Sequence, residues 1–189
     1  MIRPRSPQEI ADADALSRLV AAYSRAVDRR DLAMLRALYL PEGTDAHGRA
    51  FTGSADDYVT YVETALKAYS ATAHYVMQTA FEIDGDTAQG EVHKLNYHRT
   101  HGPDAHHVVT GSRSLDHYAR RGGAWFFRSR HVVIDWVDRR GVNAADWNDP
   151  AATSERGCAG RDDPSYRVVP AFAQALAAQW NERMDNEGL

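Results

Sequence analysis

The 189-residue chain is 43% hydrophobic and 25% charged, a composition typical of one globular domain with a good core. Its formal net charge of -4 argues against a nucleic-acid-binding surface, which normally carries a basic excess. No segment approaches the roughly 20 apolar residues that cross a bilayer, the N-terminus lacks the apolar core of a signal peptide, and the one cysteine, Cys158, fits a reducing cytoplasm. We therefore expect a cytoplasmic protein that binds neither nucleic acid nor a membrane.

The first predicted element is a long amphipathic helix. Ser6 suits its N-cap, Pro7 its first helical position, and Glu9 its first turn. From Leu16 onward, apolar residues follow the i, i+3, i+4 spacing of a helix with one buried stripe. We expect this helix to end near Asp28.

Two shorter helices follow. One is predicted over residues 31–40, because Asp31 suits an N-cap and Pro41 stops a helix. Residues 42–52 contain two glycines and a polar segment, and they predict a short strand and a turn. The third helix is predicted over 54–69, with acidic residues in its first turn, where the helix dipole favours them.

The second half of the chain predicts strands. Residues 74–83, 87–100, 108–120 and 124–137 are rich in residues that favour strands, and short turn sequences with glycine separate them. Strands joined by such short turns form an antiparallel meander. Three helices followed by this meander predict an α+β fold in which helices cover one face of a curved sheet.

The C-terminal part has a different composition. We assign residues 1–140 to the domain and residues 141–189 to an extension, which is too short and too polar for a second domain. The extension is predicted to be a loop followed by one last helix over 166–184. It would pack over a pocket mouth or against a neighbouring subunit, and the sequence does not distinguish these two.

Asp28 and His74 are the first candidates for chemistry. Asp28 borders the buried stripe at a helix C-terminus, where the dipole disfavours an anion. The alternative interpretation is a solvated acid next to two arginines. His74 opens a strand, and histidine is the side chain best suited to take and return a proton near neutral pH. The alternative is an ordinary half-buried histidine. A carboxylate partner would fix its tautomer and steady its charged form.

Three further sites carry polar groups in unexpected places. Asp45 and His47 share one face of an extended segment, although turn chemistry explains the same residues. Arg130 lies on an otherwise apolar strand face, which is costly unless the guanidinium is paired or meets a ligand, and Arg113 raises the same question. The pattern leaves open whether the face of Arg130 or that of His131 lines a pocket.

Metal and nucleotide motifs are missing from the sequence. The nine histidines include no HExxH motif and no Cys/His ligand cluster. The chain also lacks a phosphate-binding P-loop, a GxGxxG motif and a GxSxG elbow. We therefore expect no metal and no other cofactor.

The order of elements resembles the nuclear transport factor 2-like superfamily, in particular its SnoaL-like branch. The resemblance covers residues from about 14 to 138, and its segments are AAYSRAVDRRDLAMLRALY, GTDAHGRAFTGSADDYV, TAHYVMQTAFEIDGDTAQGEV and TGSRSLDHYARRGGAWFFRSRHVVIDWV. It implies a cone: a curved antiparallel sheet and three N-terminal helices that enclose a pocket. The superfamily hosts several chemistries and also binding proteins without activity, so the fold alone does not assign a function.

Within this superfamily, the scytalone dehydratase, bile-acid dehydratase and lindane dehydrochlorinase group pairs a helix-end Asp with a His on the first long strand. Asp28 and His74 stand at the matching places. Tyr23 resembles a tyrosine that bile-acid dehydratases use beside that pair, and Arg130 resembles a pocket arginine of the dehydrochlorinase. One difference is that Tyr23 lies about 140° from Asp28 on a regular helix, so both would face one cavity only if the helix end bends.

The resemblance implies a cofactor-independent lyase. His74 would remove a proton next to an activating group, with Asp28 steadying the imidazolium. Tyr23, helped by Asp45 or His47, would donate a proton to the leaving oxygen, so that water is lost. The aromatic residues, Tyr97 among them, would suit a flat hydrophobic substrate such as a steroid, a polyketide or a lignin-derived aromatic.

Other functions remain open at this point. The same pair would also serve a carbon–carbon lyase that releases formaldehyde, or an isomerase. An epoxide hydrolase would need a different carboxylate and a held water. A protein of another class, such as the small subunits of ring-hydroxylating dioxygenases, would bind or assemble without catalysis. We expect the chain to form a homo-oligomer, a dimer or a trimer.

Overall fold

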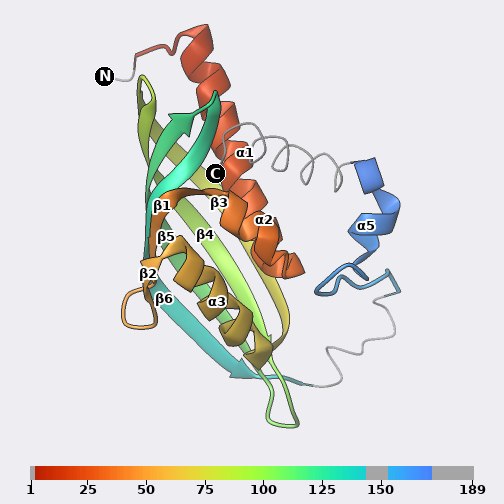
Figure 1. The fold of residues 1–189 in the computed structure, drawn as a ribbon. Coiled ribbons are helices and arrows are strands. Elements are labelled where there is room, and N and C mark those ends of the chain that lie inside the picture. The colour runs from red at the N-terminus through yellow and green to blue at the C-terminus, as the bar shows by residue number, and fades with distance from the viewer. Residues whose placement is uncertain (1–2, 144–152, 172–189) are drawn as a thin grey trace.

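The computed structural model describes residues 3–143 and 153–171. Its helices are α1 (Pro7–Arg29), α2 (Leu32–Ala37), α3 (Ala55–Ala65), a 3-10 turn (Leu66–Ala68) and α5 (Pro164–Val168). Its strands are β1 (Tyr39–Ala46), β2 (Thr52–Ser54), β3 (Tyr69–Asp84), β4 (Thr87–Thr100), β5 (His106–Arg121) and β6 (Ala124–Gly141). The predicted α+β fold is confirmed, and Figure 1 shows α1, α2 and α3 on one side of the curved sheet.

Helix α1 begins and ends where its sequence predicts. The Ser6 hydroxyl accepts from the Glu9 backbone N–H, and the Glu9 carboxylate accepts from the Ser6 backbone N–H, which completes a capping box. The helix is regular as far as Arg29. Arg30 then takes a left-handed conformation with φ 57°, and its N–H bonds back to the last turn, which ends the helix. Asp28 therefore lies in the final turn of α1.

Helix α2 is shorter than predicted. Asp31 caps it by accepting from the backbone N–H of Met34, but the helix ends at Ala37 and β1 starts at Tyr39. Pro41 therefore lies within a strand and does not terminate a helix. The β1–β6 register shifts between Tyr39 and Thr44, so this part of the strand tolerates a residue that lacks an N–H.

The sheet has the order β2-β1-β6-β5-β4-β3. The predicted meander is confirmed: β3, β4, β5 and β6 pair antiparallel in sequence, while β1 pairs parallel with β6. The β3–β4 turn uses Gly85 at φ +56°, a conformation that glycine adopts without a Cβ penalty. The pairing contains irregularities, one of them between Val76 and Gln78 in β3, and such bulges bend and twist a sheet.

The hydrophobic core lies between the helices and the concave face of the sheet. It contains the fully buried residues Leu16 and Val20 of α1, Leu35 of α2 and Phe127 of β6. This packing leaves the other end of the sheet, beside α3, free to enclose a cavity. No helix in the described part of the chain is long and apolar enough to span a membrane.

The described part of the extension packs against the C-terminal half of α1. The Gly160 backbone N–H donates to the Arg29 carbonyl at 2.9 Å, and Arg29 pairs with Asp163 at 3.2 Å. Of the helix predicted over 166–184, the structure describes residues 166–171, which contain the end of α5 and two more helical residues at 170–171; residues 172–189 lie outside the description. The division at residue 140 stays a prediction.

Candidate active site

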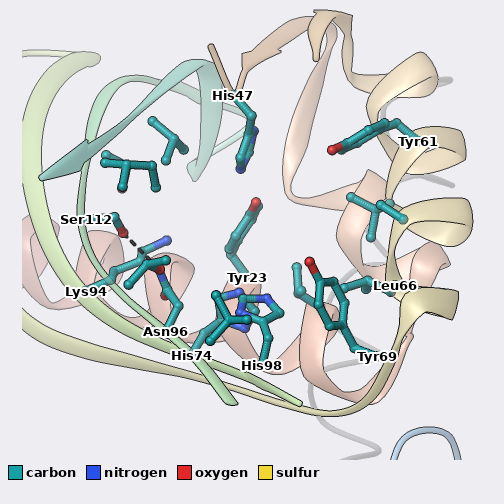
Figure 2. Close-up of a pocket in the computed structure, with 18 of the residues that line it drawn as sticks. Tyr23, His47, Tyr61, Leu66, Tyr69, His74, Lys94, Asn96, His98 and Ser112 are labelled. Atoms are coloured by element: carbon teal, nitrogen blue, oxygen red, sulfur yellow. Dashed lines mark hydrogen bonds between the residues drawn. The ribbon is translucent and has the colours of Figure 1, made fainter. Parts of the chain in front are cut away.

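A cavity of about 260 Å³ opens between α1, α3 and the concave face of β3–β6. Figure 2 shows His47 and His74 at its opposite ends, with Tyr23 between them. One side is apolar and aromatic, and it comes mainly from α1, α3 and the 3-10 turn. The polar side comes from β4 and β5. The lining residues of these two sides are Tyr23, Val27, Tyr58, Tyr61, Val62, Ala65, Leu66, Tyr69, Lys94, Asn96, His98, Thr110, Ser112 and Ser114.

Asp28 and His74 form a hydrogen-bonded pair. The Asp28 Oδ1 lies 2.7 Å from His74 Nδ1, and Oδ2 accepts from the His74 backbone N–H at 2.9 Å. Because the carboxylate only accepts, Nδ1 carries the proton and Nε2 is the basic nitrogen. No described residue hydrogen-bonds to Nε2, and the ring lines the cavity. The pair therefore presents a free base to a bound molecule.

The electrostatics of this pair favour an ionised aspartate. Burial by itself raises the pKa of Asp28, but the hydrogen bond and charge of His74, the His74 backbone N–H and the Thr72 hydroxyl outweigh burial and hold the pKa below its ordinary value. Arg30 lies close enough for the Asp28 charge to act on its pKa, and it donates to Thr72 at 2.9 Å. A charged Asp28 in turn stabilises a protonated His74.

Tyr23 and Asp28 do not share one cavity wall. Tyr23 lines the cavity, whereas Asp28 lies behind His74 and reaches the cavity only through that ring. The helix stays regular through both residues, so the bend that a shared wall would need is not present. Because the two residues are separated around the axis of α1, Tyr23 lines the cavity while Asp28 contacts Nδ1 of His74.

A second acid–base pair closes the other end of the cavity. His47 Nδ1 lies 2.6 Å from Asp45 Oδ1, and the Tyr39 hydroxyl donates to Asp45 Oδ2 at 2.5 Å. His47 Nε2 is 3.5 Å from the Tyr58 hydroxyl, which hydrogen-bonds to the Tyr23 hydroxyl. These bonds form a continuous chain from Asp45 to Tyr23.

Both tyrosines of this chain keep their protons. Burial raises the pKa of Tyr23 well above its ordinary value, and the negative charge of Asp45 adds to the effect. Burial also raises the pKa of Tyr58, with the neighbouring Tyr23 and Asp45 next in importance. Neutral hydroxyls that donate and accept at once can relay a proton without holding a charge.

The structure does not bring Tyr97 and Arg113 to the cavity. Tyr97 hydrogen-bonds to His107 Nδ1 at 2.6 Å, and Arg113 pairs with Asp135 at 2.9 Å. Strand side chains alternate between faces, so these odd-numbered positions point away from their neighbours Asn96 and Ser112, which line the cavity.

Arg130 lies on the cavity side of β6 but does not line the cavity. Its guanidinium makes two 2.8 Å bonds to Asp116 and lies 4.0 Å from the centre of the Tyr23 ring, which covers it. It supports the wall behind Tyr23, so its position does not match the expected substrate contact. The face of Val132 and Ile134 lines the cavity, which decides the question that the sequence left open.

The sequence interpretation missed the polar side of the cavity. Lys94, Asn96, His98 and Ser112 all face inward, and Asn96 donates to Ser112 at 2.8 Å (Figure 2). Burial and the nearby His74 lower the pKa of His98 to about 4, so this ring is neutral near pH 7. The signal in the sequence was the period of two along 87–100, but only the pairing with β3 shows which face meets His74.

Within the described ranges, no group of three or more His, Cys, Asp or Glu side chains is arranged to hold a metal ion. The acid–base groups of the cavity come instead as two His–Asp pairs, at His74 and at His47. Each pair uses one histidine nitrogen for its carboxylate; the other nitrogen of His47 lies near the Tyr58 hydroxyl, and that of His74 bonds to no described residue.

A family model for the SnoaL-like domain matches residues 8–131. Among solved structures, a scytalone dehydratase-like protein of Novosphingobium aromaticivorans aligns with TM-score 0.64 and 19% identity, over 78% of this chain and 97% of that chain. The hexachlorocyclohexane dehydrochlorinase LinA-type3 of Novosphingobium barchaimii aligns with TM-score 0.61 and 16% identity, over 70% of this chain and 92% of that chain.

A protein of unknown function from Mycobacterium tuberculosis aligns over 93% of this chain and 95% of its own, with TM-score 0.59 and 14% identity. No curated protein matches the chain. At these identities, the structural matches show a common fold, which agrees with the cone shape seen here.

Proposed function

Because the chain belongs to the SnoaL-like domain family, we propose that it is a lyase that eliminates water from a small hydrophobic, hydroxylated substrate without a cofactor. The observation that carries the proposal is the Asp28–His74 pair, in which His74 lines the cavity and its Nε2 bonds to no described residue. The names of two structural relatives also support an elimination, because a dehydratase and a dehydrochlorinase both remove a proton and a leaving group from adjacent carbons.

In the proposed reaction, His74 Nε2 removes a proton from the carbon next to an activating group. Asp28 holds the ring in the required tautomer and stabilises the imidazolium, since its own pKa is low enough to keep it charged. General base catalysis of this kind is typically worth about 10²–10⁴-fold in rate.

The leaving hydroxyl needs a proton, and the chain from Asp45 to Tyr23 can supply one. A protonated His47 would donate to Tyr58, Tyr58 to Tyr23, and Tyr23 to the leaving oxygen. Each hydroxyl gives one proton as it receives another, so neither tyrosine has to ionise. Asp45 would stabilise the charged His47 through its 2.6 Å hydrogen bond.

The size and walls of the cavity favour one class of substrate. Aromatic and aliphatic side chains form one wall, which suits a flat ring, and hydroxyl and amide groups form the opposite wall. The volume of about 260 Å³ falls below the roughly 300–1,000 Å³ typical of pockets for drug-sized ligands. Among the substrate classes considered, a one- or two-ring aromatic or polyketide fits better than a steroid.

A panel of hydroxylated aromatic carbonyl compounds tests this proposal. Mass spectrometry of the products separates loss of water, loss of formaldehyde and isomerisation, in which the mass does not change. We expect loss of water, with His74→Ala and Asp28→Asn each reducing kcat/KM by about 10²–10⁴-fold. His101→Ala, in an exposed turn, is the matched control and should keep full activity. If both pair variants keep the wild-type rate, the proposed role of the pair is wrong.

A further inference from the structure

Lys94 is a buried amine without a counter-ion. It lies on the inner face of β4, is 7% exposed and lines the cavity. No described residue makes a hydrogen bond or ion pair with its ammonium group, and its one recorded partner is the Tyr23 ring, whose centre is 4.6 Å from Nζ. Burying an ammonium without a paired anion is costly, so this arrangement indicates that a ligand supplies the missing partner.

The groups around Lys94 are also incompletely paired. Asp116 on β5 is the carboxylate whose charge acts most on Lys94, but both of its oxygens bond to Arg130. The Nη1 atom of Arg130, the Ser114 hydroxyl and the Oδ1 atom of Asn96 are buried without a hydrogen-bond partner. Two of these three residues, Asn96 and Ser114, line the cavity together with Lys94. The region around Lys94 therefore contains buried polar atoms without a hydrogen-bond partner and a positive charge without a paired anion.

The charge on Lys94 depends on what occupies the cavity. Burial and, next in importance, the positive charge of Arg130 lower the pKa of Lys94 to about 7, although the charges of Asp116, Asp45 and Asp28 act in the opposite direction. An anionic oxygen placed beside Nζ would raise the pKa again, because it favours the ammonium form. An enolate is such an oxygen.

The strand register places Lys94 beside the base. His74 pairs with Asn96 across β3 and β4, and Val76 pairs with Lys94, so Lys94 is the diagonal neighbour of His74 on the same face. Diagonal neighbours are about 7–8 Å apart, within reach of a long side chain. This spacing leaves room for a carbonyl group whose oxygen meets Lys94 and whose neighbouring C–H meets His74.

We propose that Lys94, as an ammonium, binds the carbonyl oxygen that becomes an enolate when His74 removes the adjacent proton, so that the substrate is a β-hydroxy carbonyl compound. This inference rests on the proposed function and names its activating group. Lys94 is then a catalytic residue, because its ammonium touches the atom on which charge develops.

The proposed elimination has two steps, formation of the enolate and loss of the β-hydroxyl group. His74 takes the proton on the α carbon, the C–H pair forms the carbon–carbon double bond of the enolate, and the carbonyl π pair moves to the oxygen that Lys94 binds. The enolate then re-forms the carbonyl, the double bond moves between the α and β carbons, and the β C–O bond breaks. The leaving hydroxide takes a proton from Tyr23 and departs as water, which leaves an α,β-unsaturated carbonyl product.

Binding of para-nitrophenol tests the inference without a known substrate. Its phenolate resembles an enolate in shape and charge, and the absorbance of the bound ion reports its ionisation directly. Para-nitroanisole is the matched ligand that cannot ionise. We expect Lys94→Met to weaken phenolate binding by about 10- to 100-fold and to change nitroanisole binding less than about twofold. Equal phenolate affinity in wild type and Lys94→Met would overturn the inference.

The lysine content of the chain permits a second measurement. Lys94 and the exposed Lys67 are its two lysines, so carbon-13 labelling of the lysine side chains gives two NMR signals, and Lys67→Met assigns them. We expect the pKa of Lys94 to rise when phenolate binds and that of Lys67 to stay constant. A Lys94 pKa that does not change on binding also contradicts the inference. This readout uses the wild-type protein and does not depend on how a cavity variant folds.

The two proposals fail in different experiments. His74→Ala should still bind para-nitrophenolate, because the oxygen site lies on Lys94. If the inference fails, phenolate binding is insensitive to Lys94 whatever the activity of the His74 variant. If the proposed function fails, activity is insensitive to Asp28 and His74, while the Lys94 signal still responds to phenolate.

Discussion

The two ends of the cavity carry the same pair of residue types in different surroundings. At one end, Asp28 is 12% exposed, accepts one backbone N–H, and leaves His74 Nε2 open to a bound molecule. At the other end, the Asp45 side chain is fully buried and His47 Nε2 faces the Tyr58 hydroxyl. In the proposed mechanism, the pair whose second histidine nitrogen has no partner acts as the base, and the pair whose second nitrogen begins a hydroxyl chain supplies the proton.

The largest expected effect separates the two histidines by activity. His74→Ala removes the base and should lower kcat/KM by about 10²–10⁴-fold. His47→Ala leaves the Tyr23 hydroxyl in place as a donor and should cost about tenfold. Steady-state kinetics on the same substrate measures both. Equal losses would mean that the two ends share one role, and a larger loss for His47→Ala would reverse our assignment of base and acid.

The next effect concerns stability, and here we expect the larger loss at the His47 end of the cavity and the smaller loss at the His74 end. Asp45→Ala leaves the buried Tyr39 hydroxyl and the His47 N–H without an acceptor, so we expect a loss of about 2–4 kcal/mol in the free energy of unfolding. Asp28→Ala should cost about 1–2 kcal/mol, because water reaches this site. Urea denaturation measures both, with Asp104→Ala in an exposed turn as the control. A greater loss for Asp28→Ala would contradict the burial argument.

A smaller effect tests the link between the two ends. Tyr58→Phe removes the hydroxyl that joins His47 to Tyr23 and should lower kcat by roughly tenfold while leaving His74 unchanged. Tyr61→Phe is the control, since Tyr61 also lines the cavity and its hydroxyl bonds to no described residue. If the two variants behave alike, the hydroxyl chain does not carry the proton.

The smallest expected effect is a change in acid stability. The folded-state pKa of Asp28 is held below 3.8, so its contribution to stability is present above that value and is lost as the pH falls through the folded-state pKa. Asp28→Asn lacks this contribution. Its unfolding free energy should therefore fall less steeply than that of the wild type below about pH 3.8. Parallel curves in acid-dependent urea denaturation would show that the Asp28 pKa is not shifted on folding.

Local signals explain which elements were predicted correctly. Ser6 and Glu9 define the start of α1, and Gly85 marks the turn into β4, because caps and turns depend on a few neighbouring residues. The second helix was predicted too long because Tyr39 and Pro41 suit more than one structure, and the pairing of β1 with β6 decides between them. Long-range pairing of this kind has no local signature.

The same limit applies to the candidate site. Asp28 and His74 were found because each stood out locally and matched a family pattern. Lys94 was missed because it fits an ordinary strand, and the fold alone places it at the cavity. Arg130 stood out locally as an arginine on an apolar strand face, but its guanidinium pairs with Asp116 on the neighbouring strand β5 and does not need a ligand for its charge.

By itself, the sequence determined the α+β class and the four meander strands, because periodicity, caps and turns are encoded over short distances, whereas Asp28 and His74 were paired through their match to a family pattern. The tertiary structure alone decided which strand face encloses the cavity and that Lys94 lies there without a counter-ion. The physical reason is that strand register and helix packing are set by the whole core, and a shift of one residue turns every side chain of a strand to its other face.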